Sequence, residues 1–110
     1  MFAQQPISDD LVFDITQRIV ESFHPRRIIA FGSYARGEQK PDSDLDLIVE
    51  MESDKPFYER GRGIAALFRN RKWAMDLLVY TPQEFDDLKQ VLGTLPYSAE
   101  REGKILYERS

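Results

Sequence analysis

The chain has 110 residues, of which 42% are hydrophobic and 12% aromatic, so we expect a single compact domain over residues 1–110. It contains no cysteine, which excludes a disulfide framework and a thiolate zinc site, and its net charge of −4 argues against direct nucleic-acid binding. The longest apolar run is five residues, far below the roughly 18 of a membrane span, so we expect a cytoplasmic protein without membrane contact.

The first predicted element is a core-packing helix. Ser8 is a suitable N-cap, Asp9 and Asp10 occupy the first turn, and the helix should end near His24 and Pro25. Its apolar face consists of Leu11, Ile15, Ile19, Val20 and Phe23. His24, the only histidine, is interpreted as a helix cap or a surface residue rather than a chemical group.

A short apolar strand from Arg27 to Phe31 leads into a Gly-Ser turn, and a second strand follows after a segment without periodicity. That second strand, Ser43 to Val49, alternates polar and apolar residues. Successive side chains in a strand point to opposite faces, so Asp44 and Asp46 should share one face. Two carboxylates this close repel each other. A cation must neutralise them, or one must hold a proton.

These carboxylates favour a divalent-metal site. Oxygen ligands suit Mg²⁺, which leaves coordination positions to water and substrate phosphates. Gly32 would let a backbone N–H approach an anion, Ser33 would add a hydroxyl, and a helix beginning at Tyr34 would direct its positive end at a phosphate. The alternative is a turn followed by an edge strand with solvated aspartates.

A broken or mobile helix is predicted from Ser53 to Phe68, with Pro56 near its start and with Gly61 and Gly63 weakening it. The only basic concentration in the chain begins within it: Arg60, Arg62, Arg69, Arg71 and Lys72. This cluster is either a solvated face or a surface for an acidic partner or nucleic acid.

The run from Trp73 to Tyr80 predicts a buried strand interrupted by Asp76. An aspartate in such a run needs a partner or a metal, unless it is exposed at the start of the strand. Thr81, Pro82 and Glu84 then form a capping box that opens a helix.

After a further turn from Tyr97 to Arg101, residues 103–108 predict a last short strand. Strands alternating with helices indicate a single α/β domain. Its sheet should carry the acids on one face and the helices on the other.

The motif Gly32-Ser33-x-Ala35-Arg36-Gly37, five unmatched positions, then Ser43-Asp44-x-Asp46-Leu47-x-Val49 resembles the signature of the minimal nucleotidyltransferases of the DNA polymerase β-like superfamily. The resemblance implies a polymerase β-like fold with a mixed sheet. It also implies that Asp44, Asp46 and Asp76 hold two Mg²⁺ ions for catalysis, and that ATP is the co-substrate.

Nucleotide contacts are implied for Gly32, Ser33, Arg36 and Ser43. From the residues alone, Arg36 is equally well a solvated charge, a structural ion pair or a phosphate contact.

Minimal nucleotidyltransferases that resemble this chain are commonly paired with a small HEPN-domain protein. The resemblance therefore implies an antitoxin that transfers AMP from ATP to a tyrosine of a HEPN ribonuclease toxin. A small-molecule nucleotidyltransferase of the aminoglycoside-modifying kind and a catalytically silent antitoxin acting by occlusion remain open. A domain this small has little surface to enclose both substrates, so we also expect a partner chain, in a homo- or hetero-oligomer.

Overall fold

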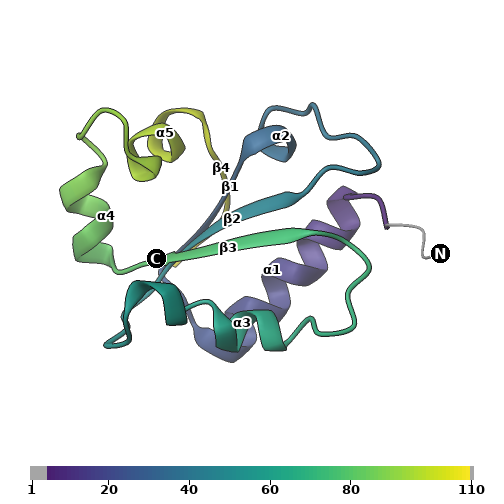
Figure 1. Ribbon diagram of the computed structural model, residues 1–110, viewed down its shortest axis with the longest axis horizontal. Coiled ribbons are helices and arrows are strands. Elements are labelled where there is room, and N and C mark those ends of the chain that lie inside the picture. The colour runs from purple at the N-terminus through teal and green to yellow at the C-terminus, as the bar shows by residue number, and fades with distance from the viewer. Residues whose placement is uncertain (1–4, 110) are drawn as a thin grey trace.

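A four-stranded mixed sheet organises the chain, and the computed structural model describes residues 5–109 of it (Figure 1). The strands are β1 (Arg27–Phe31), β2 (Leu45–Glu50), β3 (Met75–Tyr80) and β4 (Lys104–Glu108), in the spatial order β3-β2-β1-β4. β1 pairs antiparallel with both β2 and β4, whereas β2 and β3 are parallel. The predicted α/β class and the placement of the third strand beside the D-x-D strand are both confirmed.

The N-terminal helix α1 (Asp9–Phe23) forms for the reasons that its sequence indicates. The Ser8 hydroxyl accepts a hydrogen bond of 3.1 Å from the Leu11 N–H, and the helix ends where His24 adopts a left-handed conformation with φ of 50°. The interpretation of His24 as a cap is therefore confirmed. Within residues 5–109, no helix combines the length and the apolar character that crossing a membrane requires.

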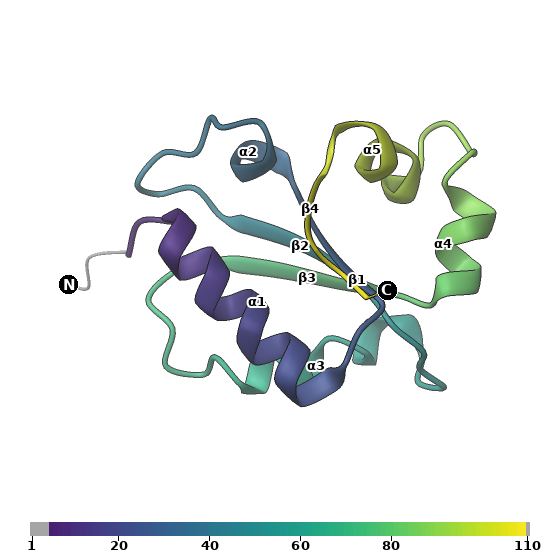
Figure 2. The same ribbon diagram turned by 180° about the vertical axis from the view of Figure 1, so that it is seen from behind.

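Helices cover both faces of the sheet, as Figures 1 and 2 show from opposite sides. α1 and α3 (Arg62–Ala66) pack on the face that includes Ile28 and Leu47, and α4 (Pro82–Leu88) and α5 (Leu95–Glu102) pack on the face that includes Ile29 and Ile48. The expectation that helices occupy one face only is therefore corrected. Both faces of β1 and β2 are apolar along most of their length, so each needs a cover.

The connection from β2 to β3 is a broken helix, as predicted. A short 3₁₀ helix, η1 (Phe57–Glu59), is separated from α3 by Arg60 and Gly61. This junction lies along the outer edge of β3. The Arg60 guanidinium donates a hydrogen bond of 3.3 Å to the Val79 carbonyl, and a Cβ on Gly61 would lie 3.4 Å from the Leu77 carbonyl oxygen. Such a cover protects the sheet edge from pairing with another chain.

The C-terminal part follows its capping signals. Thr81 and Glu84 form the reciprocal capping box at the start of α4, as predicted. The turn expected at Tyr97–Arg101 is an eight-residue helix, α5, whose N-cap Thr94 accepts from the Tyr97 N–H at 3.3 Å. The final strand is confirmed as β4.

One buried charge was not anticipated from the sequence. Glu50, the last residue of β2, is 0% exposed and accepts from Arg27 at 2.7 Å and from Arg26 at 3.3 Å. The Arg27 side chain is itself only 12% exposed and stacks over the Phe85 ring at 4.8 Å. The buried carboxylate is therefore neutralised by a nearly buried guanidinium.

Candidate active site

Two carboxylates meet where the parallel strands β2 and β3 begin. The register pairs Asp46 with Asp76, so both side chains lie on the same face of the sheet. The pKa of Asp46 is raised from 3.8 to about 6, chiefly by burial, then by a hydrogen bond to Asp76, by the charge of Asp76 and by that of Asp44. A hydrogen bond between two carboxyl groups requires that one of them holds a proton.

Asp76 differs from its predicted setting. β3 is an edge strand rather than a buried strand, and Asp76 is exposed at its second position. Because Asp76 is exposed, it does not incur the burial cost that would have required a partner or a metal. This is the alternative given in the sequence analysis, an aspartate exposed at the start of its strand. The Asp76 side chain nevertheless faces Asp46, so Asp76 is both exposed and part of an acid pair.

Asp44 lies in the loop one residue before β2 and is exposed, rather than being part of the strand. Its charge contributes to the raised pKa of Asp46. Over residues 5–109, however, no three acidic or histidine side chains stand close enough together to hold a metal ion. Of the expected three-carboxylate cluster, the described structure therefore pairs only Asp46 with Asp76.

Gly32 is required by the position of Asp46. Its φ is +70°, and a Cβ at this position would collide with the Asp46 carboxylate oxygen Oδ2. The short helix α2 (Gly32–Ala35) begins at this glycine, two residues earlier than predicted. Ser33 follows in α2 and accepts from the Glu38 N–H through its carbonyl at 2.9 Å. The Gly-Ser turn and the acid pair therefore adjoin each other, as the motif predicts.

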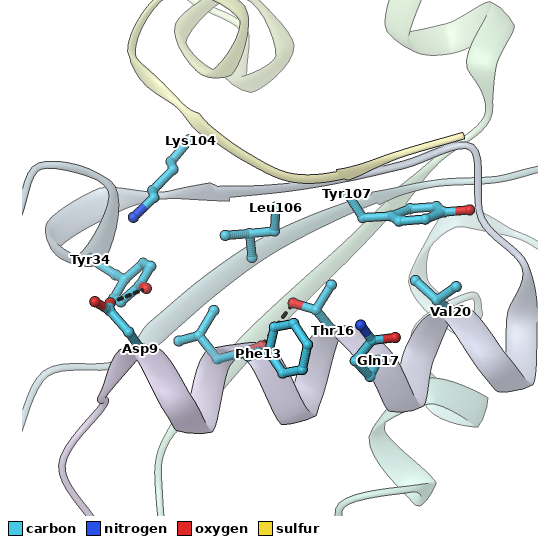
Figure 3. Close-up of a pocket in the computed structure, with 10 residues that line it drawn as sticks. Asp9, Phe13, Thr16, Gln17, Val20, Tyr34, Lys104, Leu106 and Tyr107 are labelled. Atoms are coloured by element: carbon cyan, nitrogen blue, oxygen red, sulfur yellow. Dashed lines mark hydrogen bonds between the residues drawn. The ribbon is translucent and has the colours of Figure 1, made fainter. Parts of the chain in front are cut away.

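Tyr34 connects α2 to α1 by a hydrogen bond that the sequence did not predict (Figure 3). Its hydroxyl donates a hydrogen bond of 2.6 Å to Asp9 Oδ1, and burial together with that bond raises the pKa of Tyr34 to about 12. The Lys104 ammonium lies 5.2 Å from the centre of the Tyr34 ring. In the sequence, Tyr34 merely follows the Gly-Ser turn. Only the packing of α1 beside α2 shows that Tyr34 holds this turn in place.

Arg36 and Ser43 lie in the loop between α2 and β2. Arg36 Nε donates to Glu38 Oε1 at 2.5 Å, and its half-exposed guanidinium lowers the pKa of Asp46. A hollow of about 170 Å³ adjoins Arg36 and Gly32 and reaches Ser98 on α5. Ser43 Oγ accepts from the Lys40 N–H at 2.7 Å and closes a turn of the loop. Their nucleotide contacts stay predictions.

The donor set fits a hard divalent cation. Asp46 and Asp76 offer only carboxylate oxygens, Asp44 is close enough to act on the charge of Asp46, and the glycine leaves no side chain between the acids and the turn. The pKa of Asp46 is raised chiefly by burial and then by its acidic neighbours, and a cation placed between these carboxylates would favour their charged forms. Asp44, Asp46 and Asp76 therefore stay the predicted Mg²⁺ ligands.

The fold and this site define a nucleotidyltransferase domain. Residues 13–107 match the family described as "Nucleotidyltransferase domain", so the chain belongs to that family. It is similar to a protein of Methanocaldococcus jannaschii provisionally named a protein adenylyltransferase, with 46% identity over 43 residues, or 39% of this chain and 43% of that protein. It is also similar to the protein adenylyltransferase MntA of Thermococcus cleftensis, with 56% identity over 32 residues, or 29% of this chain and 32% of that protein.

The matched stretches span less than half the length of these two relatives. A solved structure with the same fold is that of a provisionally named nucleotidyltransferase from Sulfolobus solfataricus. Its TM-score is 0.62 at 19% sequence identity, and the match covers 91% of this chain and 79% of that one. The predicted family and the polymerase β-like fold are therefore confirmed.

Proposed function

We propose that this chain is a Mg²⁺-dependent protein adenylyltransferase that transfers AMP from ATP to a tyrosine hydroxyl of a partner HEPN-domain ribonuclease. The observation that carries the proposal is the pairing of Asp46 with Asp76 on adjacent parallel strands, directly against Gly32. Two relatives that are named protein adenylyltransferases support the choice of a protein acceptor.

We propose a separate task for each residue of the site. The Gly32 N–H and the Ser33 hydroxyl would hold the β- and γ-phosphates at the start of α2, and Asp44 and Asp46 would hold the metal on the nucleotide side. When bound, Mg²⁺ supplies charge neutralisation at the triphosphate and acidifies the acceptor hydroxyl. Two ions are what the family resemblance implies.

Asp76 is suited to the acceptor side because it is exposed at the sheet edge, where an incoming hydroxyl can reach it. It would accept the proton of the tyrosine hydroxyl as the new oxygen–phosphorus bond forms at the α-phosphate. The bond between the α-phosphorus and the bridging oxygen then breaks, and pyrophosphate leaves with that oxygen. The proton passes from Asp76 to water.

We propose a partner protein because the hollow beside the site is small. The hollow of about 170 Å³ beside Gly32 and Arg36 is too small to enclose both a nucleotide and a protein acceptor. A second protein would have to bring its tyrosine to the exposed side of Asp76 and exclude water there.

Co-expression with a candidate HEPN protein tests this function. Intact-mass measurement of that protein should show the addition of AMP with the wild-type chain and none with Asp76→Asn. Modification of an aminoglycoside instead would favour the small-molecule reaction. Neutralisation of the toxin by Asp76→Asn at full strength, without any added mass, would favour occlusion.

A further inference from the structure

A second surface lies away from the acid pair. Between α1 and the loop that joins α3 to β3 there is a hollow of about 450 Å³. It lies on the side of the sheet that α1 and α3 cover, and Figure 2 shows these two helices on that side. We call it the basic groove. Its charged, polar and aromatic lining consists of Arg18, Phe68, Arg69, Asn70, Arg71 and Trp73.

The basic cluster expected from the sequence divides into two groups. Arg60 forms an ion pair with Glu84 at 2.6 Å, and Arg62 lies 3.9 Å from Glu59, so both are accounted for elsewhere. Arg69 and Arg71 instead line the groove, where α1 adds an arginine that the linear pattern could not associate with them. The groove is thus assembled from two segments distant in sequence.

The three arginines of the groove have no acidic partner in the described part of the chain. Arg18 donates to the Leu67 carbonyl at 2.5 Å and lies over the Phe68 ring at 4.5 Å, and Arg71 donates to the Phe68 carbonyl at 3.3 Å. These contacts hold two guanidiniums in place but use only one N–H of each. Most of their donors therefore remain available, in a chain whose net charge is −4.

Trp73 adds an unused donor to the same lining. Its Nε1 atom is buried and has no hydrogen-bond partner among residues 5–109. A buried indole N–H without an acceptor is uncommon, because the lost hydration is not replaced. Trp73 thus lines the groove with an indole whose own N–H is buried, and the guanidiniums beside it are the donors that a ligand with oxygen acceptors would meet.

The aromatic geometry distinguishes between two kinds of anionic ligand. Phe68 is 2% exposed with Arg18 over its face, and Trp73 meets it edge to face at an interplanar angle of 62°. Neither arrangement offers the open stack of rings that single-stranded nucleic acid uses. Three guanidiniums in a net acidic chain are also few for a polyanion, whereas they match a small number of carboxylates.

We propose that the basic groove binds an acidic segment of a partner protein, whose carboxylates pair with Arg18, Arg69 and Arg71. Across Arg18, Asp14 and Glu21 line an adjoining hollow of about 310 Å³. A segment that carries a basic residue next to its acids would place the acids in the basic groove and the basic residue in the adjoining hollow. This arrangement fixes which way the segment runs along α1. This binding requires no nucleotide, metal or transfer reaction.

The single tryptophan of the chain makes the test specific to the groove, because the lining includes it. The full-length protein is titrated with a short peptide of alternating glutamate and serine while Trp73 emission is recorded. A peptide with lysine in place of glutamate and an oligouridylate serve as competing probes. Arg69→Glu is the informative variant because Arg69 makes no ion pair with any residue of the described range 5–109, and Arg62→Glu is its control outside the groove.

We expect the glutamate peptide to produce a saturable change in emission that weakens with added salt. Arg69→Glu should reduce the affinity by about tenfold, while Arg62→Glu should leave it within about twofold of wild type. Tighter binding of the oligouridylate than of the glutamate peptide would overturn the choice of an acidic protein segment. Absence of any saturable change, or equal losses in the two variants, would overturn the site.

Discussion

Replacing Asp46 with asparagine should stabilise the protein in the absence of divalent cations. In the folded chain the pKa of Asp46 is raised from 3.8 to about 6 by burial, by Asp76 and by Asp44. A folded-state pKa above the unfolded value means that the folded state binds more protons between those two pH values. The wild-type free energy of unfolding therefore falls as the pH rises from about 4 to about 6. Asparagine, which carries no charge, avoids that loss.

The size of the effect follows from the same values. A difference of about two pKa units corresponds to about 3 kcal/mol at 1.36 kcal/mol per unit. Asp46 is only partly buried and both its acidic neighbours are exposed, so solvent screening reduces the expected gain to about 1 kcal/mol. In a domain of this size that gain raises Tm by roughly 4 °C.

Urea unfolding in a chelating buffer measures the gain directly. We expect Asp46→Asn to be more stable than wild type at pH 7.5, and the difference to shrink towards zero near pH 4. Adding Mg²⁺ and ATP should reverse the order, because only the wild-type site binds them well and ligand binding stabilises the folded state. A variant that is less stable than wild type at pH 7.5 without cations would show that ionised Asp46 does not destabilise the folded state.

Three further changes test the packing around the site. Gly32→Ala should lower the free energy of unfolding by about 1–2 kcal/mol, because φ is +70° and the new methyl displaces the adjacent carboxylate; its melting temperature should no longer respond to Mg²⁺ and ATP. Arg27→Met should cost about 3 kcal/mol in urea unfolding by leaving Glu50 buried without its main partner, whereas Arg26→Met, whose side chain is 48% exposed in wild type, should cost less than about 1 kcal/mol. Tyr34→Phe should lose about 1 kcal/mol and weaken ATP binding in calorimetry, since α2 is no longer fastened to α1; unchanged ATP affinity would show that the hydrogen bond does not position the turn.

Local signals in the sequence were sufficient for much of this fold. The caps at Ser8 and Thr81 act within three residues of themselves, so reading a few neighbouring positions locates the helices that they start. The alternation through Asp46 and the lone charge at Asp76 similarly indicated two strands with acids near their beginnings. The sequence indicated that Asp76 would join the other acids if its strand lay beside the Asp46 strand. The parallel pairing of β2 with β3 meets that condition.

Contacts between distant segments were not predictable in this way. Glu50 follows an apolar run and looks like the polar end of a strand, yet antiparallel pairing of β1 with β2 places it against Arg27 and buries it. Likewise, nothing near Arg18 in the sequence connects it with Arg69, and only the packing of α1 against the α3–β3 loop does so. The edge position of β3 depends on the whole strand order, which no single segment encodes.

We propose that the site built on Asp46 and Asp76 transfers the AMP part of ATP to a protein. Incubation of the chain and a HEPN-domain partner with Mg²⁺ and ATP labelled at the α-phosphate tests it most directly, in parallel with ATP labelled at the γ-phosphate. We expect that α-label becomes attached to a tyrosine of the partner, that γ-label does not, and that Asp46→Asn abolishes the transfer. Attachment of γ-label, or α-label transfer that persists in Asp46→Asn, would contradict it.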